Sequence, residues 1–168
     1  MLKFAIILIY IIFVFLISIL FKNLNPKKKE VLRKMIHIGI GPLIPIAKYL
    51  EINQIAALYF TGIISLLIIF NYLYKVFPII EDVERKSFGT LFYCFSLFVL
   101  IYLFWESDPI SLIVGFFIMT FGDGFAGLIG KNIQSKSWFL FNQKKSILGT
   151  LTMFTISLII IFGLSYYS

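Results

Sequence analysis

The sequence predicts an all-α fold, a polytopic membrane helical bundle of about six transmembrane helices, in a single integral membrane domain over residues 1–168. Of the 168 residues, 60% are hydrophobic and only 14% are charged, and the mean hydropathy is +0.98. Soluble domains are about half apolar and about a quarter charged. Apolar runs long enough to cross a bilayer recur along the chain, and the basic residues lie between them. These three observations exclude an ordinary soluble domain.

The expected spans follow from the roughly 20 residues that a helix needs to cross the hydrocarbon core. The first run, 4–21, contains no charge and is longer than the apolar part of a signal peptide. The second run, 35–50, is short and contains two glycines and two prolines, so a kinked or re-entrant segment is an alternative to a full span. The remaining spans are expected at 55–74, 88–105, 110–130 and 147–167.

The distribution of basic residues orients the chain. If the helices alternate sides, all of the 15 basic residues except Lys3 and Lys48 lie on one face. The positive-inside rule makes that face cytoplasmic, with segments 22–36, 75–88 and 131–146 inside and both termini outside. This arrangement explains the net charge of +7 without nucleic acid as a partner. We therefore expect a multi-pass protein of a prokaryotic plasma membrane whose active face is cytoplasmic.

Cysteine and histidine usage excludes two kinds of site. The single cysteine, Cys94, excludes an internal disulfide framework, and the single histidine, His37, excludes a multi-histidine metal centre.

Asp123 lies inside the fifth expected span. A charged side chain in a membrane helix needs a partner or a polar cavity, so a functional role is favoured for it. Helical spacing places Asp123 on one stripe with Gly127 and Gly130. On a neighbouring stripe, Gly122, Ala126 and Gly130 form a ridge of small residues that is typical of helix packing. Packing therefore explains the glycines but leaves the carboxylate unexplained.

Two stretches repeat one pattern, in which a basic pair and a serine precede Gly-Thr-Leu at the start of a span. They are Arg85, Lys86, Ser87, Gly89 and Thr90, and then Lys144, Lys145, Ser146, Gly149 and Thr150. The simplest interpretation is that the serines are helix N-caps and the lysines are positive-inside flanks. A helix N-terminus beside lysines is also a suitable phosphate site. The occurrence of the pattern twice on one face, opposite a membrane carboxylate, adds support for phosphate binding.

A third element is the segment that contains Arg33, Lys34 and His37. On a helix the two cations lie four and three residues before the histidine, so the three side chains can converge. A lone histidine is more often structural than catalytic. Glu84, just before Arg85, either pairs with a neighbouring base or helps to hold a metal ion.

In this order, these elements resemble the dolichol kinase and phytol kinase family of CTP-dependent lipid-alcohol kinases, which is related to the phosphatidate cytidylyltransferases. Members look like R-K-x-x-H-I-x-x-G, E-R-x-S-x-G-T, G-D-x-x-A-x-x-x-G and K-S-x-x-G-T, and the match here covers about residues 30–152. The sequence around Asp123 is more similar to that of phytol kinases and their prokaryotic relatives than to that of dolichol kinases.

The resemblance implies transfer of the γ-phosphoryl group of CTP, with Mg²⁺, to a lipid alcohol from the bilayer: phytol, farnesol or geranylgeraniol, a dolichol-type polyprenol or diacylglycerol. It implies catalytic roles for Asp123, His37 and Glu84, with Asp123 as the magnesium ligand. The expected nucleotide-binding residues are Arg33, Lys34, Arg85, Lys86, Ser87, Gly89, Thr90, Gly127, Gly130, Lys131, Lys144, Lys145, Ser146, Gly149 and Thr150.

Alternatives stay open at this point. A CDP-lipid synthase-like cytidylyltransferase is less favoured because its longer signature is absent. A small transporter or subunit that uses Asp123 for ion coupling would suit the broken segment at 39–45, but it leaves the repeated pattern unexplained. Family members usually continue beyond the last motif. Either this shorter form of the protein is sufficient for activity, or a second chain or a homo-oligomer completes the site, or the protein has lost the family's activity.

Overall fold

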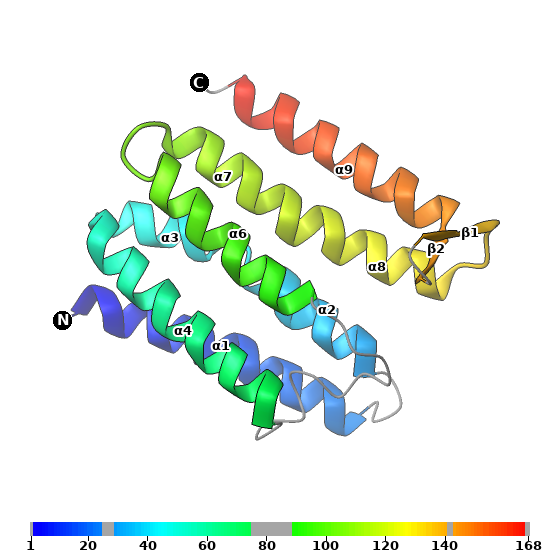
Figure 1. Ribbon diagram of the computed structural model, residues 1–168, viewed down its shortest axis with the longest axis horizontal. Coiled ribbons are helices and arrows are strands. Elements are labelled where there is room, and N and C mark those ends of the chain that lie inside the picture. Colours follow the sequence, from blue (N-terminus) through cyan, green and yellow to red (C-terminus); the bar gives the residue numbers. More distant parts are fainter. Residues whose placement is uncertain (1, 25–28, 75–88, 141–142, 167–168) are drawn as a thin grey trace.

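The computed structural model describes residues 2–24, 29–74, 89–140 and 143–166, and it is almost entirely helical (Figure 1). The helices are α1 (Leu2–Leu24), α2 (Lys29–Gly39), α3 (Leu43–Tyr49), α4 (Gln54–Tyr74), α6 (Gly89–Phe104), α7 (Pro109–Phe117), a π-helical turn η1 (Ile118–Gly122), α8 (Asp123–Asn132) and α9 (Ile147–Ser165). Two short strands, β1 (Ser137–Leu140) and β2 (Gln143–Ser146), precede α9. The prediction of an all-α membrane bundle is confirmed.

Four stretches of the described chain are long and apolar enough to cross a bilayer: Leu2–Phe21, Gln54–Asn71, Pro109–Asn132 and Ile147–Leu164. A shorter apolar helix covers Leu91–Phe104. Many large apolar side chains on these helices are exposed, such as Ile9, Leu66 and Phe162, and a helix that faces lipid requires such a surface. The total of six spans remains a prediction.

The expected span at 35–50 is divided between two helices. α2 ends at Gly39 and α3 begins at Leu43, so the segment is not one continuous helix. At Gly41 the chain runs against the ring of Phe121, since a methyl group added there would lie 2.5 Å from Cζ. Pro42 follows and has no N–H to continue a helical ladder. The break therefore lies where the glycines and prolines of this segment indicated.

One end of the bundle contains the buried core. Trp105, just after α6, packs there with Phe116 and other apolar side chains of α6 and α7 against α1 and α3. The Lys48 ammonium donates to the Trp105 carbonyl (2.9 Å) and lies 5.0 Å from the centre of its indole ring. The indole N–H donates to the Ile52 carbonyl (3.1 Å). These contacts tie α3 to the end of α6, at the end of the bundle opposite the hairpin (Figure 1).

The strands form an antiparallel hairpin that the sequence analysis did not predict. Ser137 pairs with Ser146 and Leu140 with Gln143. Ser146 then caps α9, because its hydroxyl accepts from the Gly149 amide (3.0 Å). The interpretation of Ser146 as a helix N-cap is confirmed. We call the end of the bundle that carries β1 and β2 the hairpin end.

The small-residue ridge of α8 packs against α9. A methyl group at Gly122 would lie 2.8 Å from the sulfur of Met153, and one at Gly130 would lie 2.6 Å from Ser146 Oγ and 3.4 Å from the Gly149 Cα. The two helices therefore approach as closely as their backbones allow, as small residues permit in membranes.

This packing gives a stability prediction. Gly130→Ala should lower the free energy of unfolding by about 1–3 kcal/mol, because the added methyl group overpacks a close helix contact. Gly163→Ala in α9 is the matched control, since a methyl group there would lie within 4 Å of no other described helix. Thermal unfolding in detergent measures both variants. Equal melting temperatures for the two variants would contradict the close approach.

A second prediction concerns topology. In a Cys94→Ser background, single cysteines replace the exposed residues Asn53, Glu106 and Lys136. We expect an impermeant maleimide to label position 136 only from the cytoplasmic side and positions 53 and 106 only from the other side. Labelling of positions 106 and 136 from the same side would overturn the orientation.

Candidate functional site

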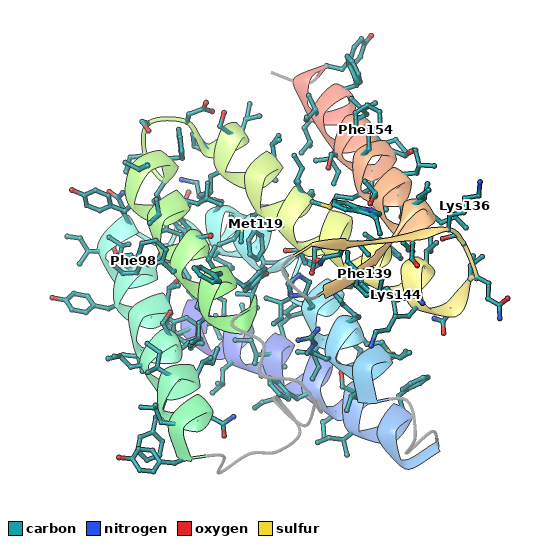
Figure 2. The ribbon with its side chains drawn as sticks, turned by 45° about the vertical axis from the view of Figure 1, so that its right-hand side comes forward. Phe98, Met119, Lys136, Phe139, Lys144 and Phe154 are labelled. Atoms are coloured by element: carbon teal, nitrogen blue, oxygen red, sulfur yellow. The ribbon has the colours of Figure 1, made fainter. Side chains whose placement is uncertain are left out.

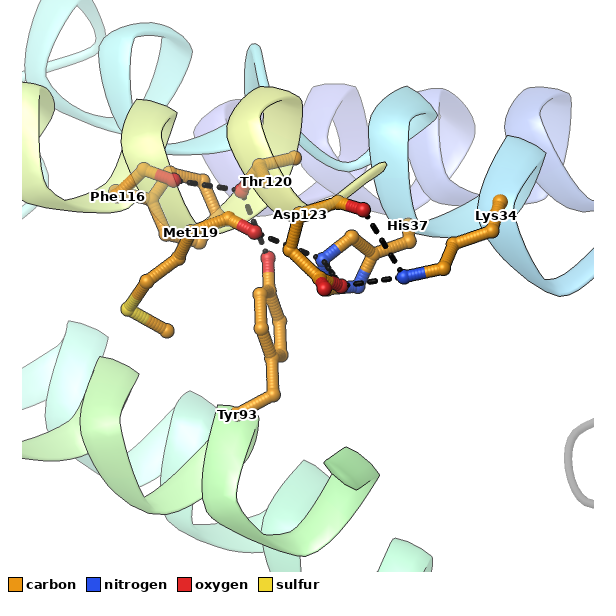
Figure 3. Close-up of polar contacts among 7 residues, drawn as sticks. All are labelled: Lys34, His37, Tyr93, Phe116, Met119, Thr120 and Asp123. Carbon is orange, nitrogen blue, oxygen red and sulfur yellow. Dashed lines mark hydrogen bonds and ion pairs between the residues drawn. The ribbon is translucent and has the colours of Figure 1, made fainter. Parts of the chain in front are cut away.

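Asp123 forms the centre of a polar cluster between α2 and α8 (Figure 3). The Lys34 ammonium lies 2.5 Å from Asp123 Oδ2 and also donates to the Asp123 carbonyl oxygen (3.1 Å). His37 Nε2 lies 3.5 Å from the same carboxylate oxygen. The Lys34 side chain is only 9% exposed, whereas that of Asp123 is 58% exposed. The carboxylate is therefore held from one side by a buried cation and is open on the other.

Two glycines of the Asp123 motif allow this contact. A methyl group at Gly127 would collide with the Lys34 side chain and lie 2.9 Å from its ammonium nitrogen, and one at Gly124 would collide with Ile38. Lys34 therefore crosses α8 at a position where only glycine leaves room, one turn after Asp123. In the structure Gly127 faces α2 and Gly130 faces α9. The two glycines, which helical spacing placed on one stripe with Asp123, therefore contact two different helices.

His37 joins α2 to the π-helical turn. Its Nε2 is 2.9 Å from the Met119 carbonyl oxygen, and because a carbonyl can only accept, this nitrogen carries the hydrogen. A π-helical turn interrupts the regular hydrogen-bond ladder and is frequent at functional sites. The imidazole also lies against Tyr93, with ring centroids 4.4 Å apart. These contacts fix the ring beside Asp123.

Tyr93 and Thr120 belong to the same cluster, and the sequence analysis missed both. The Thr120 hydroxyl donates to the Phe116 carbonyl (2.7 Å), so its one hydrogen is used. The Tyr93 hydroxyl, 3.0 Å from Thr120 Oγ1, is then the donor in their contact. Helical spacing could have indicated Thr120, which lies three residues before Asp123, but no pattern distinguishes Tyr93 from the other tyrosines of the spans.

The structure describes the second copy of the repeated basic pattern more fully than the first. Residues 84–88, with Glu84, Arg85, Lys86 and Ser87, lie outside the described residues, as does the side chain of Thr90; Gly89 begins α6. In the second copy the Thr150 hydroxyl donates to the Ser146 carbonyl (3.2 Å), and Gly149 packs on Gly130.

The first amides of α9 are bonded within the chain. Ile147 N–H donates to the Lys136 carbonyl (2.9 Å), and Leu148 N–H donates to Ser135 Oγ (3.4 Å). Together with the Gly149 amide on Ser146, these bonds take up donors that a phosphate at this helix N-terminus would need. The structure thus brings Lys34, His37 and Gly127 to Asp123. It places Lys131, Lys144 and Lys145 at the hairpin end, where all three are exposed.

The chemistry of Asp123 suits a single-carboxylate magnesium site. Mg²⁺ is usually held by one or two carboxylates, with phosphate oxygens and water completing its shell. Asp123 offers an exposed carboxylate. Lys34 and His37 both approach the same one of its two oxygens, Oδ2. Among the described residues there is no group of three or more histidine, cysteine, aspartate and glutamate side chains that could hold a metal ion; Glu84 lies outside them.

The chain is similar to curated phytol kinases. It is 37% identical over 153 residues to a phytol kinase of Synechocystis sp., a match that covers 88% of this chain and 64% of the relative. It is 32% identical over 139 residues to a probable chloroplastic phytol kinase of Zea mays (76% of this chain, 45% of the relative). It is 29% identical over 156 residues to chloroplastic phytol kinase 1 of Arabidopsis thaliana (85% of this chain, 50% of the relative).

The chain therefore spans 64% of the length of the Synechocystis relative and about half that of these plant relatives. No family model and no solved structure matches the sequence. The relatives named phytol kinase match most of the chain. These matches support the phytol kinase and dolichol kinase family as the family of this chain.

Proposed function

We propose that the chain is an integral membrane kinase that transfers the γ-phosphoryl group of CTP to a lipid alcohol of the phytol type, at the cytoplasmic face of a prokaryotic plasma membrane. The observation that carries this proposal is Asp123, an open carboxylate within a membrane-spanning segment, paired with the buried Lys34. The names of the relatives supply the alcohol class.

Phosphoryl transfer depends on charge compensation and alignment more than on covalent chemistry by the protein. Asp123 would hold Mg²⁺, which supplies positive charge to the phosphates when bound. Lys34 fixes one carboxylate oxygen, which leaves the other available, and its ammonium adds positive charge at the same place.

His37 would orient the alcohol. Because Nε2 carries the hydrogen that is donated to Met119, Nδ1 keeps the lone pair that can accept a proton from the alcohol hydroxyl. The Tyr93 ring and the Met119 carbonyl hold the imidazole in place. The apolar tail would remain in the bilayer, against the exposed apolar side chains of the helices.

The test uses the purified chain in liposomes with nucleotide labelled at the γ-phosphate and with phytol, geranylgeraniol, farnesol, a dolichol-type polyprenol or diacylglycerol. We expect labelled lipid phosphate, with CTP as the better donor than ATP and phytol or geranylgeraniol as the better acceptor. The absence of transfer to every alcohol from either nucleotide would overturn the proposal. Formation of a CDP-lipid from phosphatidate would instead favour a cytidylyltransferase.

Lys145 gives a prediction about nucleotide binding. Lys144 and Lys145 are neighbours on β2, so their side chains point to opposite faces of the hairpin, and Lys145 is the one in the motif. Lys145→Gln should raise the KM for CTP by about tenfold, the size of a lost charge-assisted hydrogen bond, and Lys144→Gln should change it less. Lys28→Gln, outside the motifs, is the control in steady-state kinetics. Equal KM values for the Lys145 and Lys28 variants would remove Lys145 from the site.

A further inference from the structure

The β1–β2 hairpin lies outside the membrane helices, beside the adjoining ends of α8 and α9 (Figure 1). It is fixed there by the bond from the Ile147 amide to the Lys136 carbonyl (2.9 Å) and by the Ser146 cap. The packing of Gly130 on Gly149 holds the same two helix ends together. The hairpin is therefore anchored to the bundle at its base and is not an isolated loop.

The two faces of the hairpin differ in exposure. Trp138 is opposite Lys145, and Phe139 is opposite Lys144. Because side chains alternate along a strand and cross-strand partners share a face, Phe139 and Lys144 lie on one face while Trp138 and Lys145 lie on the other. Phe139 is 72% exposed and Trp138 44%. Figure 2 shows Phe139 and Lys144 close together on the hairpin, with Lys136 at its base.

An exposed aromatic ring beside lysines is typical of the membrane–water interface. Trp and Tyr gather at the level of the lipid headgroups, interfacial segments bury phenylalanine at the boundary of headgroups and acyl chains, and basic side chains beside the cytoplasmic leaflet are attracted to anionic lipids. Ile147 and Leu151 in α9, the helix that follows the hairpin directly, are also exposed, at 44% and 53%. The hairpin thus leads into a helix with exposed apolar side chains, as a membrane helix requires.

We propose that the Phe139–Lys144 face of the hairpin lies on the headgroup layer of the cytoplasmic leaflet, with the Phe139 ring among the upper acyl chains and Lys136 and Lys144 bound to anionic phospholipid. The positive-inside distribution places the hairpin end on this side. This lipid contact is separate from the phosphoryl-transfer chemistry at Asp123, and it sets the depth at which the ends of α8 and α9 leave the bilayer.

The test places the fluorophore bimane on a single cysteine at position 139 or 138, in a full chain that carries Cys94→Ser, in nanodiscs with one copy each. Glu106→Cys, at the opposite end, is the control that reports water. The nanodiscs contain phosphatidylcholine with or without phosphatidylglycerol. Quenching is measured with lipids brominated near the headgroup and with aqueous iodide.

We expect the label at position 139 to be quenched several-fold more by the brominated lipid, and several-fold less by iodide, than the label at position 106. With the label at position 138 and Phe139 intact, Lys144→Gln should reduce the effect of phosphatidylglycerol, since one lysine near an anionic surface changes binding by about fivefold. Lys3→Gln, the same charge change at the other end of the chain, should not.

Two outcomes would overturn the proposal. One is a label at position 139 that is as open to iodide as the label at position 106. The other is protection of position 139 that is absent in these nanodiscs and appears only in a parallel preparation with two copies in each disc, which would assign this face to a second protein molecule. Neither readout requires activity, so the result is independent of the kinase proposal.

Discussion

Asp123→Asn is expected to lower kcat for phosphoryl transfer by at least about 100-fold, the usual cost of removing a preorganised electrostatic contact from an active site. The asparagine keeps the size of the side chain but loses the charge that would hold Mg²⁺. It also keeps an oxygen that can accept from Lys34, so the local geometry should persist. The measurement is single-turnover transfer from labelled CTP, with protein insertion followed by size-exclusion chromatography in detergent.

Asp123→Glu is the informative companion, because it keeps the charge and lengthens the side chain by one methylene group. It should bind Mg²⁺–nucleotide but transfer phosphate slowly, since the position of the metal changes by about 1 Å, enough to cost about 100-fold. Near-normal turnover in Asp123→Asn would mean that residues 122–130 serve helix packing and not catalysis. The kinase proposal would then lose the residue that carries it.

Three members of the cluster, Asp123, Lys34 and His37, were predictable because they are marked in the sequence in two independent ways. A carboxylate within an apolar run is conspicuous by its cost, and the spacing of Lys34 and His37 places both on one side of a short helix. The break after Gly39 was predictable for a local reason, since closely spaced glycines and prolines do not continue a helix.

Other features depend on contacts that spacing does not encode. The π-helical turn from Ile118 to Gly122 has no pattern of its own, and it changes which side chains follow it on the helix face. Tyr93 reaches Thr120 from another helix, α6, and spacing along one helix does not encode such a contact. The hairpin was missed because Trp138, Phe139 and Leu140 are consecutive large apolar residues, without the alternation that predicts a half-buried strand.

The Lys34–Asp123 pair should respond asymmetrically to mutation, because its two partners differ in burial. Lys34 is 9% exposed and Asp123 58%, so removing the carboxylate leaves a buried ammonium without its partner, whereas removing the lysine leaves a carboxylate that is open on one side. Breaking a fully buried pair costs about 3–5 kcal/mol, and the exposure of Asp123 reduces this here. We expect Asp123→Ala to lower the free energy of unfolding by about 2 kcal/mol, because it leaves the buried ammonium of Lys34 without the carboxylate.

Lys34→Met removes the stranded cation instead and keeps the length of the side chain that crosses Gly127. Its stability should be within about 1 kcal/mol of the parent protein, because an apolar side chain of similar volume often replaces a buried ion at little cost. The double variant Lys34→Met/Asp123→Ala should then be more stable than Asp123→Ala alone, which a double-mutant cycle from thermal unfolding in detergent measures.

The activity of these variants should not follow their stability. Lys34→Met should lower kcat by about tenfold or more, since a charge-assisted contact of 1.5–3 kcal/mol is lost at the phosphates, and the double variant should be as inactive as Asp123→Ala. If Lys34→Met destabilised the protein more than Asp123→Ala, the lysine would be a structural support of the α2–α8 contact, and its ammonium would have no part in the site.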